Sequence, residues 1–174
     1  MTLVAPGYGP RQAFRSFHFD RSSILSEGRL SDYGHTYDQL EPGQRFEHWP
    51  GRTITEFDDT LFSLMSMNQH PLHIDEEYAS KTQHGRRVVV GPLVIALVIG
   101  MSERDVGGRA TATLEYRDIR HVNPVFHGDT IYARSHIVGK ENGVVTVFSE
   151  GLNQKGEVVL SLERRLAIPL AQPA

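Results

Sequence analysis

The spacing of hydrophobic residues changes once along the chain, from a helical pattern in the first half to strand-like alternation in the second. After Gly107-Gly108, apolar and β-branched residues alternate with polar ones, and turns rich in Gly and Asn separate the runs. Together with one earlier strand-like run, the strands that we expect are 45–54, 110–116, 129–139, 144–153 and 157–168. Helices followed by an antiparallel meander predict the α+β class.

Two longer helices are predicted in the first half, with a short one at 75–79 between them. The first should begin after Thr55, which can cap it, and end near Asn68. Apolar residues at spacings of three and four give this helix one apolar face, formed by Phe57, Leu61, Leu64 and Met65. The second should start at Pro92 and continue to Met101 through residues that are apolar on nearly every face, which predicts burial.

The first 36 residues carry little periodic signal and open with several Pro and Gly residues. We interpret residues 1–36 as an arm that is irregular or ordered only against another surface. The remainder, residues 37–170, has the size of one domain.

Composition excludes several functional classes. A formal net charge of −3 and a pI near 6.3 give no basic field for nucleic acid or for a membrane surface. No cysteine is present, which excludes disulfides, thiolate metal sites and a Cys nucleophile. We see no secretory signal, and the longest apolar stretch, 88–101, is too short to cross a bilayer, so we expect a soluble cytoplasmic protein. We expect no metal, since no helical His pair with a carboxylate occurs.

A Pro-containing loop carries the candidate chemistry. Asn68 and His73 stand five positions apart with Pro71 between them, so the loop can aim an amide and an imidazole at one point. Hydration of a double bond conjugated to a thioester needs such an arrangement, because a base must take a proton from water while charge gathers on the thioester oxygen. His73 is the candidate base, and Asn68 can orient the water. Alternatively, Asn68 is a helix C-cap, and Asp75 is expected to cap the next short helix.

A donor for the thioester oxygen is available where the second helix begins. The backbone N–H of Gly91 lies there, with the helix dipole behind it. Pro92 has no N–H, so Gly91 or Val90 must donate.

Several segments, in order, resemble the MaoC-like (R)-specific enoyl-CoA hydratase/dehydratase family, whose members have the hot-dog fold. The resemblance covers about 37–169, and the segments that carry it are Pro71-Leu72-His73-Ile74-Asp75, Gly85-Arg86, Val90-Gly91-Pro92-Leu93 and 124–130. It implies a long central helix wrapped by an antiparallel β-sheet and pairing with a second copy as a homodimer or higher homo-oligomer. It also implies an acyl-CoA substrate, with no metal and no cofactor apart from the CoA of the substrate.

The loop departs from the family pattern at two positions. Asn68 stands where the hydratases usually have an Asp that shares the catalytic work, and His70 stands where they usually have Asn. An Asn cannot act as a base near neutral pH, although it can orient a water. A loop of Asn, two polar residues and Pro-Leu-His resembles the branch associated with dicarboxylic acyl-CoAs such as mesaconyl-CoA or β-methylmalyl-CoA.

For such a substrate, Arg86 or Arg87 could pair with the distal carboxylate. The further residues expected to contact substrate are His70, Pro71 and Val90. Arg117, Arg120 and His121 are interpreted as a solvated strand end, with contact to the CoA phosphates as the alternative.

The leading hypothesis is therefore a hydro-lyase that adds water to a 2-enoyl-CoA or removes it from a 3-hydroxyacyl-CoA. A thioesterase is one alternative, in which Asp75 or Glu76 would supply the carboxylate. The other is a non-catalytic acyl-CoA-binding protein, which Asn68 in place of Asp supports.

Overall fold

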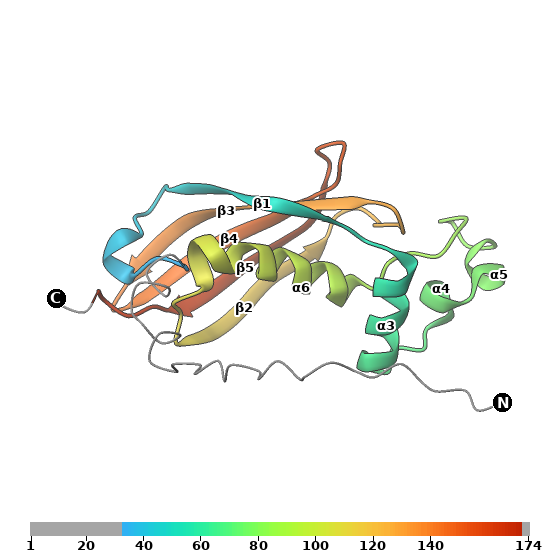
Figure 1. The fold of residues 1–174 in the computed structure, drawn as a ribbon, viewed down its shortest axis with the longest axis horizontal. Coiled ribbons are helices and arrows are strands. Elements are labelled where there is room, and N and C mark those ends of the chain that lie inside the picture. The colour runs from blue at the N-terminus through green and yellow to red at the C-terminus, as the bar shows by residue number, and fades with distance from the viewer. Residues whose placement is uncertain (1–32, 172–174) are drawn as a thin grey trace, which may run out of the picture.

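A computed structural model describes residues 33–171 and confirms the α+β class. Five antiparallel strands form one sheet in the order β1-β3-β4-β5-β2, and the longest helix, α6, lies lengthwise on one face of it (Figure 1). In chain order the elements are η1 (Tyr37–Gln39), β1 (Arg45–Thr53), α3 (Glu56–Ser66), α4 (Pro71–Ile74), α5 (Glu76–Ala79), α6 (Gly91–Ser102), η2 (Glu103–Gly107), β2 (Ala112–His121), β3 (Thr130–Glu141), β4 (Val144–Leu152) and β5 (Val158–Ala167). Most of the predicted arm, residues 1–32, lies outside the described residues.

One face of α6 forms the core with the sheet. Val94 and Val98 are buried there against residues of β3 and β5 such as Ile131 and Leu160. The prediction of burial holds for this face only, because Ala96 is exposed on the other. Within the described residues, no helix is long and apolar enough to cross a membrane.

The apolar face predicted for α3 points to solvent. Phe57, Leu64 and Met65 are 71%, 72% and 77% exposed, whereas Asp59 and Ser63 are buried. The periodicity identified the helix correctly, and Thr55 caps it as expected through the N–H of Asp58. It did not identify the inward face, because the buried side of α3 is used for a polar contact with the loop before α6.

Strand β2 runs five residues beyond its predicted end at Tyr116 and forms an edge of the sheet. Within residues 33–171 it pairs only with β5, and nearly all of its residues are exposed, including Leu114 and Ile119. The other strands lie within two residues of their predicted bounds at nearly every end. The predicted hairpin turn joins β3 to β4 at Asn142-Gly143, where both residues have positive φ.

A buried polar contact ties the end of α6 to the sheet. Arg164 on β5 is 1% exposed and donates to Glu103 Oε1 at 2.9 Å and to Ser102 Oγ at 2.5 Å. Its neighbour Arg165 points to the opposite face of β5 and makes a looser, exposed ion pair with Glu115.

Replacing Arg164 by Leu should lower the free energy of unfolding by about 3 kcal/mol, because it leaves the Glu103 carboxylate without its buried partner. Urea unfolding followed by circular dichroism measures the loss. The matched control is Arg165→Leu, which should cost less than about 1 kcal/mol, as exposed ion pairs do. Equal losses in the two variants would contradict a structural role for the buried arginine.

Candidate active site

The residues singled out in the sequence lie around the N-terminal end of α6, where α3, α4 and α5 project beyond the sheet (Figure 1). Pro71 begins α4, a single helical turn, so His73 stands on a short helix and not in the irregular loop that we expected. Pro71 forms the first helical position, where its missing N–H costs nothing. Asp75 caps α5 as predicted, accepting from Tyr78 N–H at 3.0 Å.

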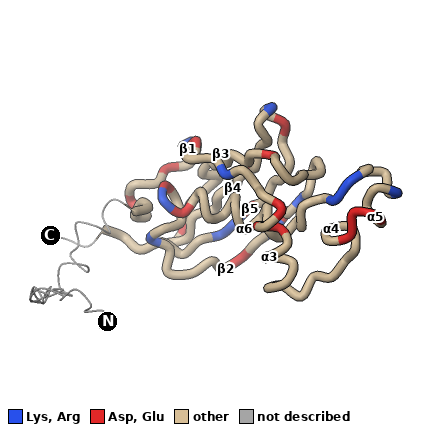
Figure 2. The backbone as a smooth tube through the Cα atoms, turned by 45° about the vertical axis from the view of Figure 1, so that its right-hand side comes forward, with Lys and Arg blue, Asp and Glu red and all other residues tan. Residues whose placement is uncertain are grey.

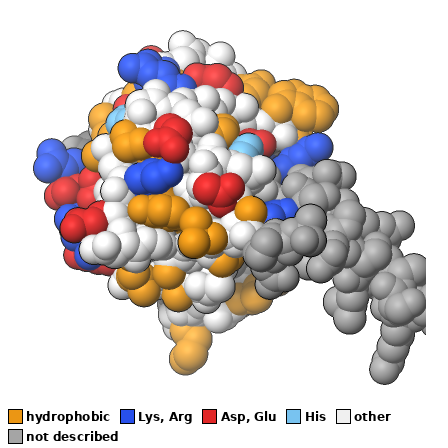
Figure 3. Space-filling view, turned by 90° about the vertical axis from the view of Figure 1, so that its left-hand side faces the viewer, with side chains coloured by type: hydrophobic (Ala, Val, Ile, Leu, Met, Phe, Trp, Pro, Cys, Tyr) orange, Lys and Arg blue, Asp and Glu red, His pale blue; other side chains and the backbone are white. Residues whose placement is uncertain are grey.

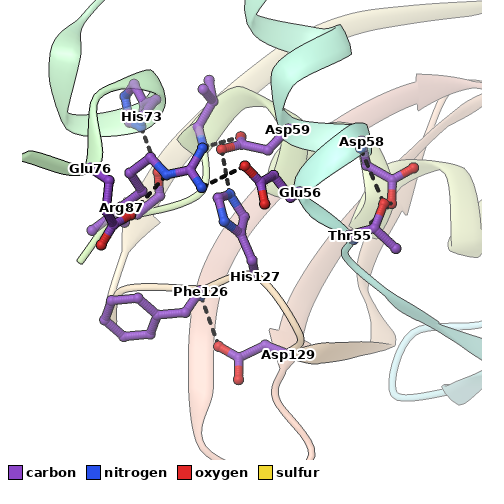
Figure 4. Close-up of polar contacts among 12 residues, drawn as sticks. Thr55, Glu56, Asp58, Asp59, His73, Glu76, Arg87, Phe126, His127 and Asp129 are labelled. Carbon is purple, nitrogen blue, oxygen red and sulfur yellow. Dashed lines mark hydrogen bonds and ion pairs between the residues drawn. The ribbon is translucent and has the colours of Figure 1, made fainter. Parts of the chain in front are cut away.

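The tautomer of His73 is set by its backbone partner. Its Nδ1 lies 2.7 Å from the carbonyl oxygen of Val88 (Figure 4). A carbonyl only accepts, so Nδ1 carries the proton and Nε2 of the neutral ring is left as an acceptor. Hydrogen bonding from Val88 N–H to Leu72 O at 3.2 Å holds the same two segments together. His73 therefore offers an acceptor nitrogen at Nε2, which is what a general base requires.

A cavity of about 330 Å³ brings His73 and Gly91 together, as the sequence suggested. Val88, Val89 and Val94 give it apolar walls. His121 also lines this cavity, although the sequence analysis did not place it beside His73 and Gly91. It is exposed at the end of β2, as the interpretation of a solvated strand end predicts.

Of the two candidate N–H donors, only that of Gly91 is available. The Val90 N–H donates to Asp59 Oδ1 at 2.8 Å, and Val90 itself is 1% exposed, behind the cavity surface. Within residues 33–171, the N–H of Gly91 makes no hydrogen bond. It stands at the first turn of α6, where unpaired N–H groups carry partial positive charge.

Asp59 is a buried residue behind the site that the sequence analysis missed. Its carboxylate is 1% exposed and also contacts His127 Nε2 at 2.9 Å, so two segments far apart in sequence meet on it (Figure 4). The run Glu56-Phe57-Asp58-Asp59 could have indicated it, because the run has more carboxylates than the cap of one helix uses, so one of them was free for another partner. His127 lies in the segment 124–130, whose resemblance to the family was noted without a role for this side chain.

The structure does not bring Asn68 into the cavity with His73. Its Oδ1 accepts from His70 N–H at 3.1 Å, and Asn68 lines a separate cavity of about 220 Å³ beside α3. The left-handed cap of α3 is Met67, not Asn68. His70 caps α4 by accepting Leu72 N–H at Nδ1, and its ring lies 5.8 Å from that of His73.

Arg87 is already paired within the chain. It donates to Glu56 at 2.6 Å and to Glu76 at 2.9 Å, and its side chain is 16% exposed (Figure 4). The Arg87 guanidinium lowers the pKa of the Glu56 carboxyl, and the two carboxylates raise the pKa of Arg87. Arg86 stacks on the ring of Phe126, 3.9 Å from its centroid, which leaves the guanidinium edges for other partners.

The charged residues elsewhere do not suggest a second site. Basic and acidic residues are interspersed along the chain in Figure 2. No group of His, Asp and Glu side chains within residues 33–171 could hold a metal ion. The arrangement therefore offers an oriented base, a free N–H at a helix N-terminus and apolar walls, which suits proton transfer next to a carbonyl.

A family model described as a MaoC-like domain matches residues 38–157. Among curated proteins, a mesaconyl-CoA hydratase from Cereibacter sphaeroides is 34% identical over 137 residues. That alignment covers 75% of this chain and 40% of the relative, so the chain spans less than half of that relative's length.

Solved structures show the same architecture. An R-hydratase from Pseudomonas aeruginosa in unliganded form has a TM-score of 0.70 and 27% identity, covering 82% of this chain and 93% of its own. A conserved hypothetical protein from Mycobacterium tuberculosis with a double hot-dog fold has a TM-score of 0.73 at 23% identity, covering 81% of this chain and 47% of its own. The fold of residues 33–171 is thus the hot-dog fold expected from the sequence.

Replacing Asp59 by Ala should lower the free energy of unfolding by about 3 kcal/mol, since the buried Val90 N–H and His127 both lose their partner. Asp59→Asn keeps an acceptor for the Val90 N–H, so its loss of unfolding free energy should be less than half of the loss in Asp59→Ala. Thermal and urea unfolding of the two variants provide the measurement. If Asn proved as damaging as Ala, the Val90 hydrogen bond would not be the interaction that matters.

Proposed function

Since this chain belongs to the MaoC-like domain family, we propose that it is an acyl-CoA hydro-lyase, which adds water to a 2-enoyl-CoA or removes it from a 3-hydroxyacyl-CoA. The observation that carries the proposal is the placement of His73 and Gly91 in one cavity. The hydratase names of the relatives support the same reaction class.

In the hydration direction, His73 Nε2 takes a proton from water and the water oxygen bonds to the β-carbon. The electrons of the double bond move toward the thioester, whose oxygen gathers negative charge and accepts from Gly91 N–H. The α-carbon of the enolate then takes the proton back from the imidazolium of His73. Dehydration reverses these steps. The Val88 carbonyl supports both stages, because it favours the proton on Nδ1 and stabilises the imidazolium.

This scheme needs no carboxylate at position 68. Asn68 is turned into its own loop, where it fixes the backbone at His70. That contact supports a role in shaping the turn that leads to Pro71, and it makes His73 the sole base of the proposed mechanism.

We further propose that the acyl group of the substrate carries a distal carboxylate. The name of the relative, mesaconyl-CoA hydratase, supports this, because it names a dicarboxylic acyl-CoA. Of the two arginines considered, Arg86 is favoured as its partner. Arg87 is held by two carboxylates, whereas the edges of the Arg86 guanidinium are not used by the stacking contact with Phe126.

Loss of the conjugated enoyl-thioester absorbance, followed with crotonyl-CoA and mesaconyl-CoA side by side, tests the proposal. His73→Ala should reduce turnover by at least about 10²-fold, the contribution of a positioned base. The matched control is His136→Ala, an exposed imidazole that packs on Phe148 of β4 and should leave the rate unchanged.

Release of free CoA thiol without a change at the double bond would instead identify a thioesterase. Binding of both esters with neither reaction would identify a non-catalytic acyl-CoA-binding protein. A fully active His73→Ala variant would contradict the mechanism.

We propose that the protein pairs with a second copy through β2. In the described part of the chain, this strand leaves one edge unpaired and exposes Leu114, Tyr116 and Ile119, which are 54%, 48% and 42% accessible. Figure 3, which views the molecule from the left-hand side of Figure 1, shows hydrophobic side chains at the surface in the lower half of that face. An exposed apolar edge strand is a ready site for pairing.

The double variant Leu114→Lys with Tyr116→Lys should convert a dimer into a monomer of 19.5 kDa, because the two lysines of each copy would bring four like charges together in the interface. Light scattering coupled to size exclusion measures the mass. Val138→Lys on β3, 48% exposed, is the control and should remain dimeric. A monomeric wild-type protein would rule out the pairing.

A further inference from the structure

The ring of His121 lies directly against Gly91. A Cβ placed on Gly91 would stand 2.6 Å from Cε1 and 2.7 Å from Nε2 of His121, which is closer than real Cβ contacts. His121 ends β2 and Gly91 begins α6, so two elements far apart in sequence place an imidazole next to Gly91, the residue whose N–H makes no hydrogen bond within residues 33–171.

The first turn of α6 offers only one backbone donor to a thioester oxygen. The Val90 N–H is bound to Asp59, Pro92 has no N–H, and the Leu93 N–H donates to Val90 O at 3.0 Å. An enolate oxygen is stabilised best by more than one donor placed where its charge develops. A second donor must therefore come from a side chain next to Gly91.

His121 has the free atoms for this role. Within residues 33–171, neither of its ring nitrogens makes a hydrogen bond. A neutral imidazole carries one N–H, so the ring of His121 can donate a hydrogen bond to an oxygen in the cavity. His73 differs, because the Val88 carbonyl fixes its tautomer and leaves it an acceptor.

We propose that His121 is a catalytic residue whose imidazole N–H joins the Gly91 N–H in binding the thioester oxygen as it becomes negative. The inference rests on the proposed hydratase function. In the reaction, no proton is transferred from His121. The hydrogen bond from its N–H to the thioester oxygen shortens as the electrons of the double bond move onto that oxygen. It lengthens again when the α-carbon is protonated. A third imidazole of the cavity, His84, makes no such approach to Gly91.

The test compares His121→Leu and His121→Gln with the wild-type protein on the enoyl-CoA that it turns over faster. Loss of one donor to an oxyanion costs about 10²–10³-fold in kcat, so the Leu variant should fall by that factor. The Gln variant retains an N–H donor and should recover at least tenfold over Leu. KM and the affinity for butyryl-CoA, a saturated ester that cannot react, should change by less than threefold.

Thermal unfolding of each variant confirms that the fold is retained, and His136→Leu is the control for removal of an exposed imidazole. A wild-type rate in His121→Leu would overturn the inference while the proposed function stands. A raised KM with kcat unchanged would also overturn it, because His121 would then only bind the ester. A wild-type protein without turnover would defeat the proposed function itself, and this inference with it.

Discussion

The structure around the cavity depends on one buried hydrogen bond, from the Val90 N–H to the carboxylate of Asp59. Asp59 is held at 1% exposure on the inner side of α3, and its second oxygen contacts His127. A carboxylate taken this far from water is tolerated only when it is fully paired. The contact therefore fixes α3, the segment after β2 and the start of α6 relative to one another.

The chemistry follows from what this bond leaves free. Because Asp59 consumes the Val90 N–H, the donor that faces the cavity is that of Gly91, and the lack of a side chain at Gly91 gives room for the ring of His121. On the other side, the Val88 carbonyl orients His73. In the proposed mechanism, a segment of four residues, Val88–Gly91, thus orients the base and supplies the electrophilic donor through its backbone alone. A short, apolar stretch can serve such a mechanism without a polar side chain of its own.

Much of this arrangement was predictable from the sequence, and the failures have physical causes. Helix and strand positions followed from periodicity and turn residues, and His73 with Gly91 followed from the motifs. The inward face of α3 did not, because a buried carboxylate outweighed apolar residues that point to solvent. Asn68 was expected beside His73, but its short side chain is satisfied within its own turn. His121 was interpreted as part of a solvated strand end, and its place next to Gly91 was not predicted, because a contact between a strand end and a helix start, about thirty residues apart, leaves no local pattern.

The central claim is that the start of α6 polarises a thioester carbonyl. Infrared spectroscopy of crotonyl-CoA labelled with ¹³C at the thioester carbonyl measures this directly. The ester is bound to the His73→Ala variant, which lacks the proposed base and so leaves the ester unreacted. The account predicts a lower frequency than in free crotonyl-CoA, and a return toward the free value when Gly91→Ala is added, since the new Cβ displaces the His121 ring and crowds the N–H. A bound ester whose carbonyl vibrates at the frequency of the free ester would contradict it.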